Sequence, residues 1–445
     1  MESMVLKMRK MKASGIEWIG EIPEGWEVHR MKSCISQRDG GAWGDEATGE
    51  TGDCICLRIA DFDYEHFRFT DSNNLTIRHY ASPIIKKLLL QKNDILIEKS
   101  GGGEKTPVGR TVLFDKEYPA LFANFMDRLR CSDFILPQYL QYVFVTFYKN
   151  RYTQNYIKQT TGIQNLDLSS MLADEFVPVP NLNEQKLIVC YLESKCSKID
   201  NLLSKTRSSI EEYKKLKQAV ITQAVTKGVR GKREMKDSGV EWIGEIPKEW
   251  VCEKIKYATS ISRGLFNHRP RNDERYYNGK YPFIQTGDVA NATKYIVSYS
   301  QTLNELGKAV SKEFPKGTLT MTIAANVGDV AILNFDAYFP DSVVGFIPNK
   351  NIRTLYLFYV FSAMKDEFTR TAIKSTQLNL NIDRVKETFI PVTLNVNEQC
   401  EIENYLESKC AEIDGLIAKK EQLVKELESY KKSLIYEVVT GKQEV

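Results

Sequence analysis

The chain has 445 residues, of which 42% are hydrophobic and 27% charged. This length suggests two to four folded domains, and the composition argues against disorder as the main state. Its 61 Lys and Arg against 58 Asp and Glu leave a net charge of +3, which excludes a polybasic, histone-like binding mode but allows a locally basic surface.

No apolar run approaches the ~18 residues that a membrane helix needs, and the first ten residues lack the apolar core of a signal peptide. We therefore expect a cytoplasmic protein without a membrane partner. Nine cysteines, an odd number in a long chain, fit reduced thiols better than a disulfide framework. The four histidines have no ligand spacing, and Cys54 and Cys56 are too close for the usual zinc pair, so no metal site is expected.

An internal repeat organises the chain. The block Ser14–Trp26, SGIEWIGEIPEGW, recurs 224 residues later as Ser238–Trp250, SGVEWIGEIPKEW. A second block recurs at an offset of 214, where residues 183–200 and 397–414 are identical at 12 of 18 positions. The chain is therefore two copies of one unit of about 220 residues.

Between these blocks the copies share only scattered anchors, such as Ile157-Lys-Gln-Thr against Ile373-Lys-Ser-Thr. Strand composition is present in Asp94–Glu98, Arg110–Phe114, Tyr281–Asp288, Thr318–Ala324 and Val330–Leu333. Helical periodicity is present in Gln138–Tyr152 and Leu355–Thr371. Each copy is predicted to hold an α+β domain of about 150 residues with glycine-rich turns.

Each copy ends in a long amphipathic segment without proline. The first is predicted to begin at Asn183 as N-cap and to end at Gly228, and the second ends near Gly441. At 1.5 Å per residue, ~44 residues would span roughly 65 Å, a length that favours a coiled coil. Residues 183–228 carry a net charge of +4 and residues 397–442 a net charge of −3, which favours pairing of the two helices. Two separate amphipathic helices, each lying on its own domain, are the alternative.

The repeated aromatic and sulfur residues are predicted to be structural. Trp18, Trp26, Trp242 and Trp250 lie in nearly identical blocks, so base stacking by them would read two targets alike. We expect them to pack against the helices or the base of each domain. Cys196 and Cys410 occupy equivalent positions and are expected to be small packing residues.

Several catalytic motifs are missing from the sequence. There is no Asn/Asp-Pro-Pro-aromatic turn of an adenine methyltransferase, no nuclease carboxylate–Lys constellation and no Gly-x-Ser-x-Gly elbow. Ser100–Thr106 superficially resembles a phosphate-binding loop but lacks its Gly-Lys pair, which favours a flexible hairpin loop. The sequence predicts a binding protein, with no catalytic residue and no cofactor of its own.

The matched blocks and their order resemble the specificity subunit of type I restriction–modification systems. The resemblance covers essentially the whole chain. Its most specific parts are Ser14–Trp26, Ser238–Trp250 and the Phe-x-Pro-x(4–5)-Asn-Glu-Gln segments that precede both long helices. The stretch Phe314–Val330 also looks like a recognition stretch of the family. The first copy departs from it at Ser100–Thr106, which implies a different base preference or a degenerate half.

The resemblance implies a pseudo-two-fold α+β fold with two globular target recognition domains and two long helices that form an antiparallel coiled coil. The domain boundaries it implies are 12–180 and 236–392 for the recognition domains, and 181–230 and 393–442 for the helical spacer regions.

The same resemblance implies function and partners. Each recognition domain would read one half of a split double-stranded DNA target, and the helices would set the gap and dock two adenine methyltransferase subunits. Those partners would carry S-adenosylmethionine and flip the adenine. Restriction subunits that use ATP and Mg would join to cut unmodified DNA. The alternatives are a specificity subunit of a methylation-only or combined cutting–methylating system, and a non-DNA coiled-coil scaffold with two interaction domains.

Candidate DNA-contacting residues are polar side chains near glycine turns, because base readout uses Arg, Lys, Asn and Gln while phosphates accept from Lys, Arg and hydroxyls. The alternatives for them are a solvated basic loop, a buried hydrogen-bonding role or a capping turn. The first copy contributes Arg38, Lys99, Lys105, Arg110, Lys158, Gln159, Thr160 and Thr161. The second copy contributes Arg263, Asn267, His268, Arg269, Arg271, Gln285, Thr286, Lys374, Ser375, Thr376 and Gln377.

Overall fold

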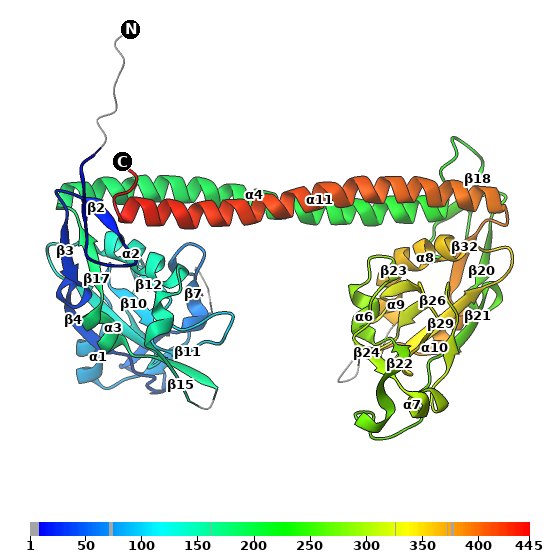
Figure 1. Ribbon diagram of the computed structural model, residues 1–445, viewed down its shortest axis with the longest axis horizontal. Coiled ribbons are helices and arrows are strands. Elements are labelled where there is room, and N and C mark those ends of the chain that lie inside the picture. The colour runs from blue at the N-terminus through cyan, green and yellow to red at the C-terminus, as the bar shows by residue number, and fades with distance from the viewer. Residues whose placement is uncertain (1–8, 71–73, 161, 325, 372, 375–377) are drawn as a thin grey trace, which may run out of the picture. The chain divides into compact units, whose positions relative to one another are not determined.

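The structure, a computed structural model, describes residues 9–70, 74–160, 162–324, 326–371, 373–374 and 378–445. The chain divides into two compact units. Unit 1 consists of Met1–Arg207 and Glu421–Val445, and unit 2 of Ser208–Lys420. Each unit holds one α+β domain, called domain 1 and domain 2 below, and part of each of two long helices (Figure 1).

Domain 1 is built on a six-stranded sheet of order β4-β14-β10-β12-β8-β7. Its strands are β4 (Ile35–Gly40), β7 (Phe62–Asp63), β8 (Arg68–Phe69), β10 (Ile95–Glu98), β12 (Thr111–Leu113) and β14 (Met126–Cys131). All four residues of β10 are buried, as expected for a central strand that is covered on both faces. The strands predicted at Asp94–Glu98 and Arg110–Phe114 are confirmed.

Smaller elements surround this sheet. A second sheet, of order β13-β6-β9-β5, consists of β5 (Asp45–Glu46), β6 (Asp53–Leu57), β9 (Ile77–His79) and β13 (Ala120–Phe122). The remaining strands of domain 1 are β1 (Met11–Ala13), β2 (Glu21–Pro23), β3 (Glu27–Arg30), β11 (Ser100–Gly101), β15 (Ile157–Thr160), β16 (Ile163–Leu166) and β17 (Phe176–Val179). The helices are α1 (Ser82–Leu88), α2 (Pro137–Lys149) and α3 (Leu168–Asp174).

Domain 2 contains a five-stranded sheet of order β21-β29-β26-β27-β23 and a four-stranded sheet of order β24-β22-β28-β25. The first comprises β21 (Thr259–Arg263), β23 (Tyr295–Ile296), β26 (Leu319–Thr322), β27 (Val330–Leu333) and β29 (Val343–Pro348). The second comprises β22 (Tyr277–Phe283), β24 (Gln301–Leu303), β25 (Glu313–Phe314) and β28 (Ala337–Tyr338).

The described residues of domain 2 also form three strand pairs and six α-helices. The pairs are β18 (Met235–Asp237) with β19 (Glu245–Pro247), β20 (Val251–Lys254) with β32 (Phe389–Val392), and β30 (Ile373–Lys374) with β31 (Leu378–Asn379). The helices are α5 (Ile255–Ala258), α6 (Thr286–Asn291), α7 (Glu305–Ala309), α8 (Thr354–Ala363), α9 (Lys365–Thr371) and α10 (Ile382–Glu387).

Two sequence predictions for domain 2 need correction. The strand predicted at Tyr281–Asp288 ends at Phe283, because Gln285 and Asp288 form a capping box that starts α6. The helix predicted at Leu355–Thr371 is interrupted at Met364, between α8 and α9. The strands predicted at Thr318–Ala324 and Val330–Leu333 are confirmed within one or two residues.

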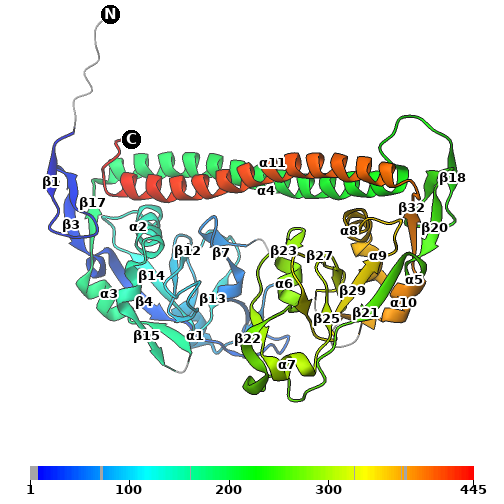
Figure 2. The same cartoon turned by 45° about the vertical axis from the view of Figure 1, so that its right-hand side comes forward.

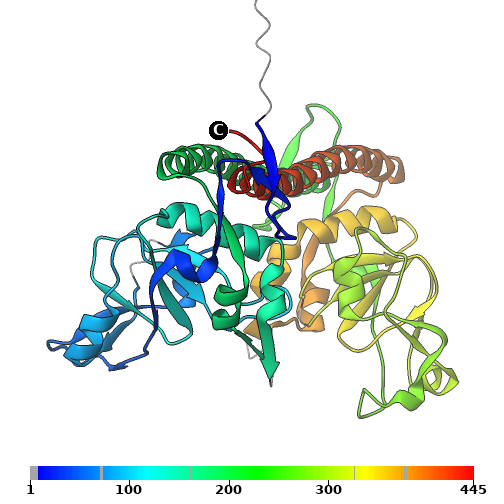
Figure 3. The same ribbon diagram turned by 60° about the vertical axis from the view of Figure 1, so that its left-hand side comes forward.

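The two domains share one strand arrangement although their sequences diverge. In domain 1, Arg128 of β14 lies opposite Leu96 of β10 and Asp39 of β4. In domain 2, Gly345 of β29 takes the same place, opposite Thr320 of β26 and Ser262 of β21. Helix α2 lies between the sheet and the long helices in unit 1, and α8 does so in unit 2 (Figures 1, 2 and 3). The predicted internal repeat is therefore a repeat of topology.

The two long helices are α4 (Leu182–Lys227) and α11 (Val396–Val439). Within unit 1 their ion pairs run in opposite chain directions: Lys431 Nζ lies 2.6 Å from Asp200 Oδ1, and Arg207 Nη2 lies 2.7 Å from Glu428 Oε1. Buried apolar residues of both helices join the core of each unit. The predicted antiparallel coiled coil is confirmed, and two independent amphipathic helices are excluded.

The start of α4 differs slightly from the prediction. Asn181, not Asn183, caps α4, because its Oδ1 accepts a hydrogen bond from the Glu184 N–H at 3.0 Å. Asn395 caps α11 in the same way, accepting from Asn397 and Glu398. The predicted end of α4 is confirmed, since Gly228 follows the helix with a φ of +70°.

The repeated Asn-Glu-Gln block anchors each domain to its helix. Gln185 accepts a hydrogen bond from the Leu136 N–H at 2.7 Å and donates to the Pro180 carbonyl at 2.8 Å. Gln399 repeats this, accepting from Arg353 and donating to the Thr393 carbonyl, both at 2.8 Å. Both amides are fully buried, so each connects the segment before α2 or α8 to the start of a long helix.

The tryptophans of the other repeated block pack as predicted. Trp18, Trp26 and Trp250 are buried, and Trp242 is half-buried. An arginine lies over the second tryptophan of each copy and pairs with the glutamate in the first turn of the nearby long helix. The two sets are Arg9, Trp26 and Glu184, and Arg233, Trp250 and Glu398.

Cys196 and Cys410 are also buried, and burial raises the pKa of the Cys196 thiol to about 11.

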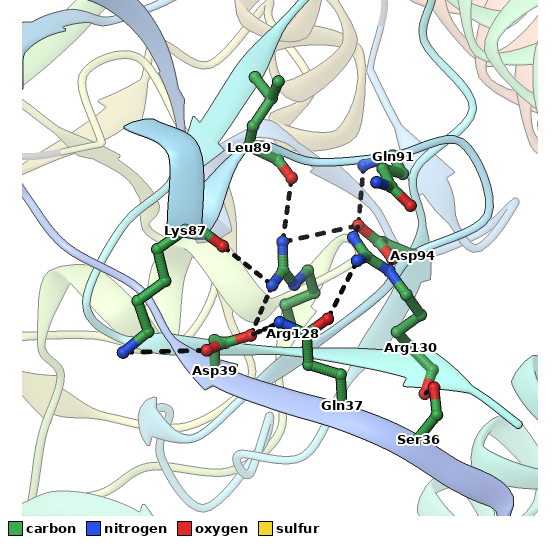
Figure 4. A network of polar contacts seen from close by, with 9 residues as sticks. All are labelled: Ser36, Gln37, Asp39, Lys87, Leu89, Gln91, Asp94, Arg128 and Arg130. Atoms are coloured by element: carbon green, nitrogen blue, oxygen red, sulfur yellow. Dashed lines mark hydrogen bonds and ion pairs between the residues drawn. The ribbon is translucent and has the colours of Figure 1, made fainter. Parts of the chain in front are cut away.

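A buried ion network occupies the middle of the domain 1 sheet (Figure 4). The Arg128 side chain is only 1% exposed, and its guanidinium contacts Asp39 Oδ2 at 2.5 Å and two backbone carbonyls at the end of α1. Asp94, which is 4.0 Å from Arg128, accepts two hydrogen bonds from Arg130 at 2.8 and 2.9 Å. Each buried charge therefore has an opposite charge and hydrogen-bonding partners.

Candidate nucleic-acid interface

In both domains the end of one strand lies against the turn before the next strand of the sheet. A Cβ on Gly41, after β4, would lie 2.2 Å from the Ala123 carbonyl oxygen, and a Cβ on Gly264, after β21, would lie 2.2 Å from the Pro340 carbonyl oxygen. Only glycine fits such a close backbone approach. We call this close contact, of Gly41 with Ala123 and of Gly264 with Pro340, the glycine crossing. Arg38 and Arg263, both predicted to contact DNA, lie next to it.

The structure brings Arg38 and Lys99 together on one carboxylate in domain 1. Arg38 Nε lies 2.7 Å from Asp127 Oδ2, and Lys99 Nζ lies 2.7 Å from Asp127 Oδ1. The Asp127 side chain is 3% exposed, whereas about one third of each cationic side chain reaches solvent. Two cations on one buried anion leave a positive site at the surface.

The other two predicted residues near the glycine turns have different environments. Arg110 makes two hydrogen bonds with Glu98, at 2.7 and 2.9 Å, and its guanidinium lies 3.7 Å from the centre of the Tyr64 ring. Its side chain is 16% exposed, so it joins β10 to β12 more than it faces solvent. Lys105 lies in the exposed turn between β11 and β12.

Lys158, Gln159 and Thr160 lie in the β15–β16 hairpin of domain 1. This hairpin extends from the end of the domain that is remote from α4 (Figures 1 and 2). Lys158 pairs with Asp167 at 2.7 Å, and this hydrogen bond, together with backbone donation from Ser170, lowers the pKa of the Asp167 carboxyl to about 2. Lys158 and Gln159 are exposed. Thr161 lies outside the described residues.

In domain 2 the predicted arginines gather on one aspartate. Arg271 forms an ion pair with Asp341, and Arg269 Nη2 lies 3.7 Å from the same carboxylate. Arg263 donates to the backbone carbonyl of Asp341. Asp341 belongs to the turn between β28 and β29, which matches the turn that Gly41 meets in domain 1. The arginine-rich loop therefore lies at the equivalent place in the second copy.

His268 and Asn267 occupy the same loop. The His268 ring stacks on Tyr276 with ring centres 4.0 Å apart, and its Nε2 lies 2.9 Å from Asp273 Oδ2. Hydrogen bonds, first of all from Arg275, lower the pKa of the Asp273 carboxyl well below its usual range. Asn267 is exposed, with its backbone N–H bonded to the Val310 carbonyl.

The remaining predicted residues of domain 2 are less accessible or not described. Gln285 caps α6 and donates to Gln301 at 2.8 Å, and Thr286 is the first residue of α6. Both are half-buried, in keeping with the hydrogen-bonding alternative for this pair. Lys374 lies in β30. Residues 375–377, which include the predicted Ser375, Thr376 and Gln377, lie outside the described residues.

The chain matches the family described as type I restriction modification DNA specificity domain, over residues 51–212 and 261–426. These two matches cover most of the chain and correspond to the two copies. The chain belongs to this family.

Two relatives of the family come from the archaeon Methanocaldococcus jannaschii. The MjaX protein, assigned as a specificity subunit of a type I restriction enzyme, is 26% identical over 437 residues, which cover 95% of each chain. The MjaVIII specificity subunit is 26% identical over 377 residues, or 80% of each chain. The predicted function, DNA-specificity subunit of a type I restriction–modification system without catalytic activity of its own, is confirmed at this level.

Solved structures support the fold. A chain from a type I restriction–modification system, solved in a study of complex assembly and conformational transition, covers 95% of this chain with a TM-score of 0.73 at 15% identity. The HsdS subunit from Thermoanaerobacter tengcongensis also covers 95%, with a TM-score of 0.51 at 14% identity. The predicted fold of two α+β domains and a helical pair is therefore shared with these proteins.

Sequence reasoning missed three exposed residues of this specificity-domain protein near the candidate surface. Phe125 is 53% exposed, and its carbonyl accepts hydrogen bonds from the Lys99 and Ser100 N–H groups. Asn165 lies exposed on β16, directly opposite Lys158. Trp43, 41% exposed, lies under the Arg78 guanidinium. A signal was available only for Asn165, which is repeated as Asn379 in the second copy.

The described residues contain neither a candidate metal site nor a candidate membrane span. Among those residues, no three or more His, Cys, Asp or Glu side chains are placed to hold a metal ion. None of the described helices combines the length and apolarity that crossing a membrane requires. All nine cysteines are free thiols.

Proposed function

We propose that this chain reads a split double-stranded DNA target, with one half-site contacted by each recognition domain. The observation that carries this proposal is a contrast between the copies. They share sheet register, helix anchors and the glycine crossing at Gly41 and Gly264, yet they place different side chains beside that crossing. A common scaffold with different surface residues is what recognition of two different half-sites requires.

The basic residues near the crossing supply the contacts in this proposal. In domain 1, Arg38 and Lys99 are held by a buried carboxylate with part of each side chain in solvent. In domain 2, Arg269 and Arg271 are exposed on Asp341. Held in this way, arginine can bond guanine O6 and N7, and either cation can bond phosphate.

We further propose that α4 and α11 set the distance between the half-sites and dock two adenine methyltransferase subunits. The Lys431–Asp200 ion pair of unit 1 recurs as Lys217–Asp414 in unit 2, at 2.7 Å. Large apolar side chains remain exposed on the helices of both units, and such exposure is typical of an interaction surface. They include Leu187, Leu202 and Tyr430 in unit 1, and Leu216 and Tyr405 in unit 2.

The chemistry belongs to the partners in this proposal, which places the complex in the cytoplasm. The methyltransferase subunits would carry S-adenosylmethionine, and restriction subunits joined through them would use ATP and Mg. This chain would supply target choice alone, in keeping with relatives that are named as specificity subunits.

Base-resolution methylation mapping tests the proposal. DNA from cells that carry the cognate methyltransferase is mapped with and without this chain, and a second specificity chain confirms that the methyltransferase is active. The expected result is a new split motif with adenine methylation on both strands. If no motif depends on this chain while the control chain gives its own motif, the proposed function is wrong.

The spacer role has a separate test. Four residues inserted after Ser204, within α4, should lengthen the helix by about 6 Å and give a motif with a longer gap and unchanged half-sites. A mapped motif with an unchanged gap would exclude the spacer role.

A further inference from the structure

The β15–β16 hairpin has one face on domain 1 and one face in solvent. In its three-stranded sheet with β11, Lys158 lies opposite Asn165, and Asn165 lies opposite Ser100. Side chains of directly opposed residues share a face. In the adjacent row Gln164 points inward, since it is buried and its Oε1 accepts from the Val108 N–H at 3.3 Å, whereas its pairing partner Gln159 is exposed. Lys158 and Asn165 therefore lie side by side on the solvent face.

This pair is already ordered without a ligand. The Ser100 hydroxyl donates to Asn165 Oδ1 at 2.5 Å, which fixes the amide orientation and leaves both Nδ2 hydrogens directed elsewhere. The Lys158 side chain is 75% exposed, and its ammonium donates one hydrogen bond to Asp167. With respect to the residues that the structure describes, two donors of the ammonium and two of the amide are thus available to an acceptor above this face.

The second copy repeats the hairpin base but not its tip. Ile157-Lys158 matches Ile373-Lys374, and Asn165-Leu166 matches Asn379-Leu380. The backbone connection matches as well: Leu166 N–H donates to the Lys99 carbonyl, and Leu380 N–H to the Ile323 carbonyl. Four residues separate Thr160 from Asn165, whereas two separate Thr376 from Asn379.

A side chain that is identical in both copies cannot distinguish two different half-sites. The DNA backbone, in contrast, presents the same phosphate oxygens at every half-site, and ammonium and amide donors suit them. The copies differ instead at the turn that holds Phe125 in domain 1 and Asp341 in domain 2. Hence the residues that both copies share suit phosphate binding, and the residues that differ between the copies suit base recognition.

We propose that Lys158 and Asn165, with Ser100 as a positioning residue, bind the DNA backbone phosphates and contribute affinity without base choice. The inference rests on the proposed DNA-reading function and deepens it. The residues around the glycine crossing select the nucleobases, and Lys158 and Asn165 only bind the DNA backbone.

Salt-dependent binding by the chain in complex with its methyltransferase tests this. For Lys158→Gln, affinity should fall by the same factor on cognate and scrambled duplexes, and the slope of log K against log salt should decrease in magnitude by about 0.9, the value for one phosphate contact. Asn165→Ala should also weaken both duplexes equally but leave the slope unchanged, because the amide carries no charge. The mapped methylation motif should be that of the wild type for both variants.

The matched control is Lys12→Gln, an exposed lysine on β1, at the end of unit 1 that is near the long helices (Figure 2). It removes the same charge and should change neither slope nor affinity. A Lys158→Gln complex with an unaltered slope overturns the phosphate contact. A changed base in the domain 1 half-site for either variant shows base reading and overturns the division of tasks. Failure of the wild-type complex to prefer any split motif contradicts the proposed function instead.

Discussion

The central sheets of the two domains use opposite chemistry at one position. In domain 1 that position is Arg128, buried among Asp39, Asp94 and backbone carbonyls. In domain 2 it is Gly345, and a Cβ there would lie 2.8 Å from the Phe314 ring, which fills the space. The backbone pairing is the same in both cases. Strand register is therefore kept by backbone hydrogen bonds, while the side chains between the sheets were free to change together.

The helix anchors show the reverse behaviour. Gln185 and Gln399 bond backbone groups of two separate segments each, and no other side chain of that length offers both a donor and an acceptor in the same plane. A side chain that must both donate to one backbone segment and accept from another leaves one acceptable residue type, whereas an ion pair such as Arg128–Asp39 can be replaced as a set. This difference explains why the copies match around the helices and diverge in the sheets.

Replacement of Arg128 should give the largest loss of stability. Arg128→Met leaves Asp39 buried without its main cation and removes the second cation near Asp94. Removal of one partner from a comparable buried pair costs about 3–5 kcal/mol. Hydrogen–deuterium exchange should show faster opening of domain 1 with domain 2 unchanged. Arg130→Met, at a more exposed site, is the control and should cost less. Equal stability of Arg128→Met and wild type would contradict the assigned role of the network.

The two anchors should respond equally. Gln185→Leu and Gln399→Leu each leave backbone groups buried without partners, at a cost of about 1–3 kcal/mol. The first variant should destabilise unit 1 and the second unit 2, each by the same amount. Thermal unfolding with hydrogen–deuterium exchange as the readout for each unit measures this. The isosteric Gln→Glu pair tests whether the amide donor matters. A large effect in only one unit would show that the anchors are not equivalent.

A smaller effect is expected from Gly345→Ala. The added methyl meets Phe314 ring atoms at 2.8 Å and Thr318 at 3.0 Å, and overpacking of this kind costs about 1–3 kcal/mol. Gly345→Ala combined with Phe314→Leu should recover part of the loss in denaturant unfolding. If the single substitution is neutral, the glycine is not required by packing.

The smallest expected effect is a pH dependence present in only one of two equivalent strand pairs, β20–β32 of unit 2 and β3–β17 of unit 1. In unit 2, hydrogen bonds from Lys254 and Lys256 lower the pKa of the Glu387 carboxyl from 4.5 to about 2. A lowered carboxyl pKa adds stability above pH 4.5 that is lost as the pH falls toward 2. At the corresponding contact in unit 1, Arg30 donates to the Ala173 carbonyl, which does not titrate.

Exchange rates measured between pH 5 and pH 2, after correction for intrinsic rates, test this contrast. Strands β20 and β32 should lose protection on acidification to a greater degree than β3 and β17. Glu387→Gln should abolish the difference. Equal acid sensitivity of both strand pairs would show that this ion pair does not contribute.

The sequence predicted those features that depend on repetition and periodicity. The two copies, the long helices and the central strands were identified because each leaves a pattern along the chain. The predicted N-cap of α4 is wrong by two residues because Asn181 and Asn183 are both good capping residues, and only the backbone path decides between them.

The candidate surface was predicted less well, for a physical reason. Arg110 looked like a free cation, but hairpin register places it beside Glu98, twelve residues away. Asp127 and Asp341, which gather the predicted cations, and Phe125 drew no attention in the sequence. Which charged side chains form ion pairs depends on strand register and on turns between distant strands. Neither can be predicted from the local sequence.

Unit 1 is assembled from both ends of the chain, and this has a consequence for the order of synthesis. Its core contains Leu434, Ile435 and Val438 from the end of α11, whereas unit 2 is one continuous stretch, Ser208–Lys420. At about 5–20 residues per second, a ribosome needs roughly 10–40 s to pass from the first part of unit 1 to its last. During that interval the apolar surface of domain 1 that Leu434 later covers is exposed to solvent. Unit 1 is therefore begun first and completed last.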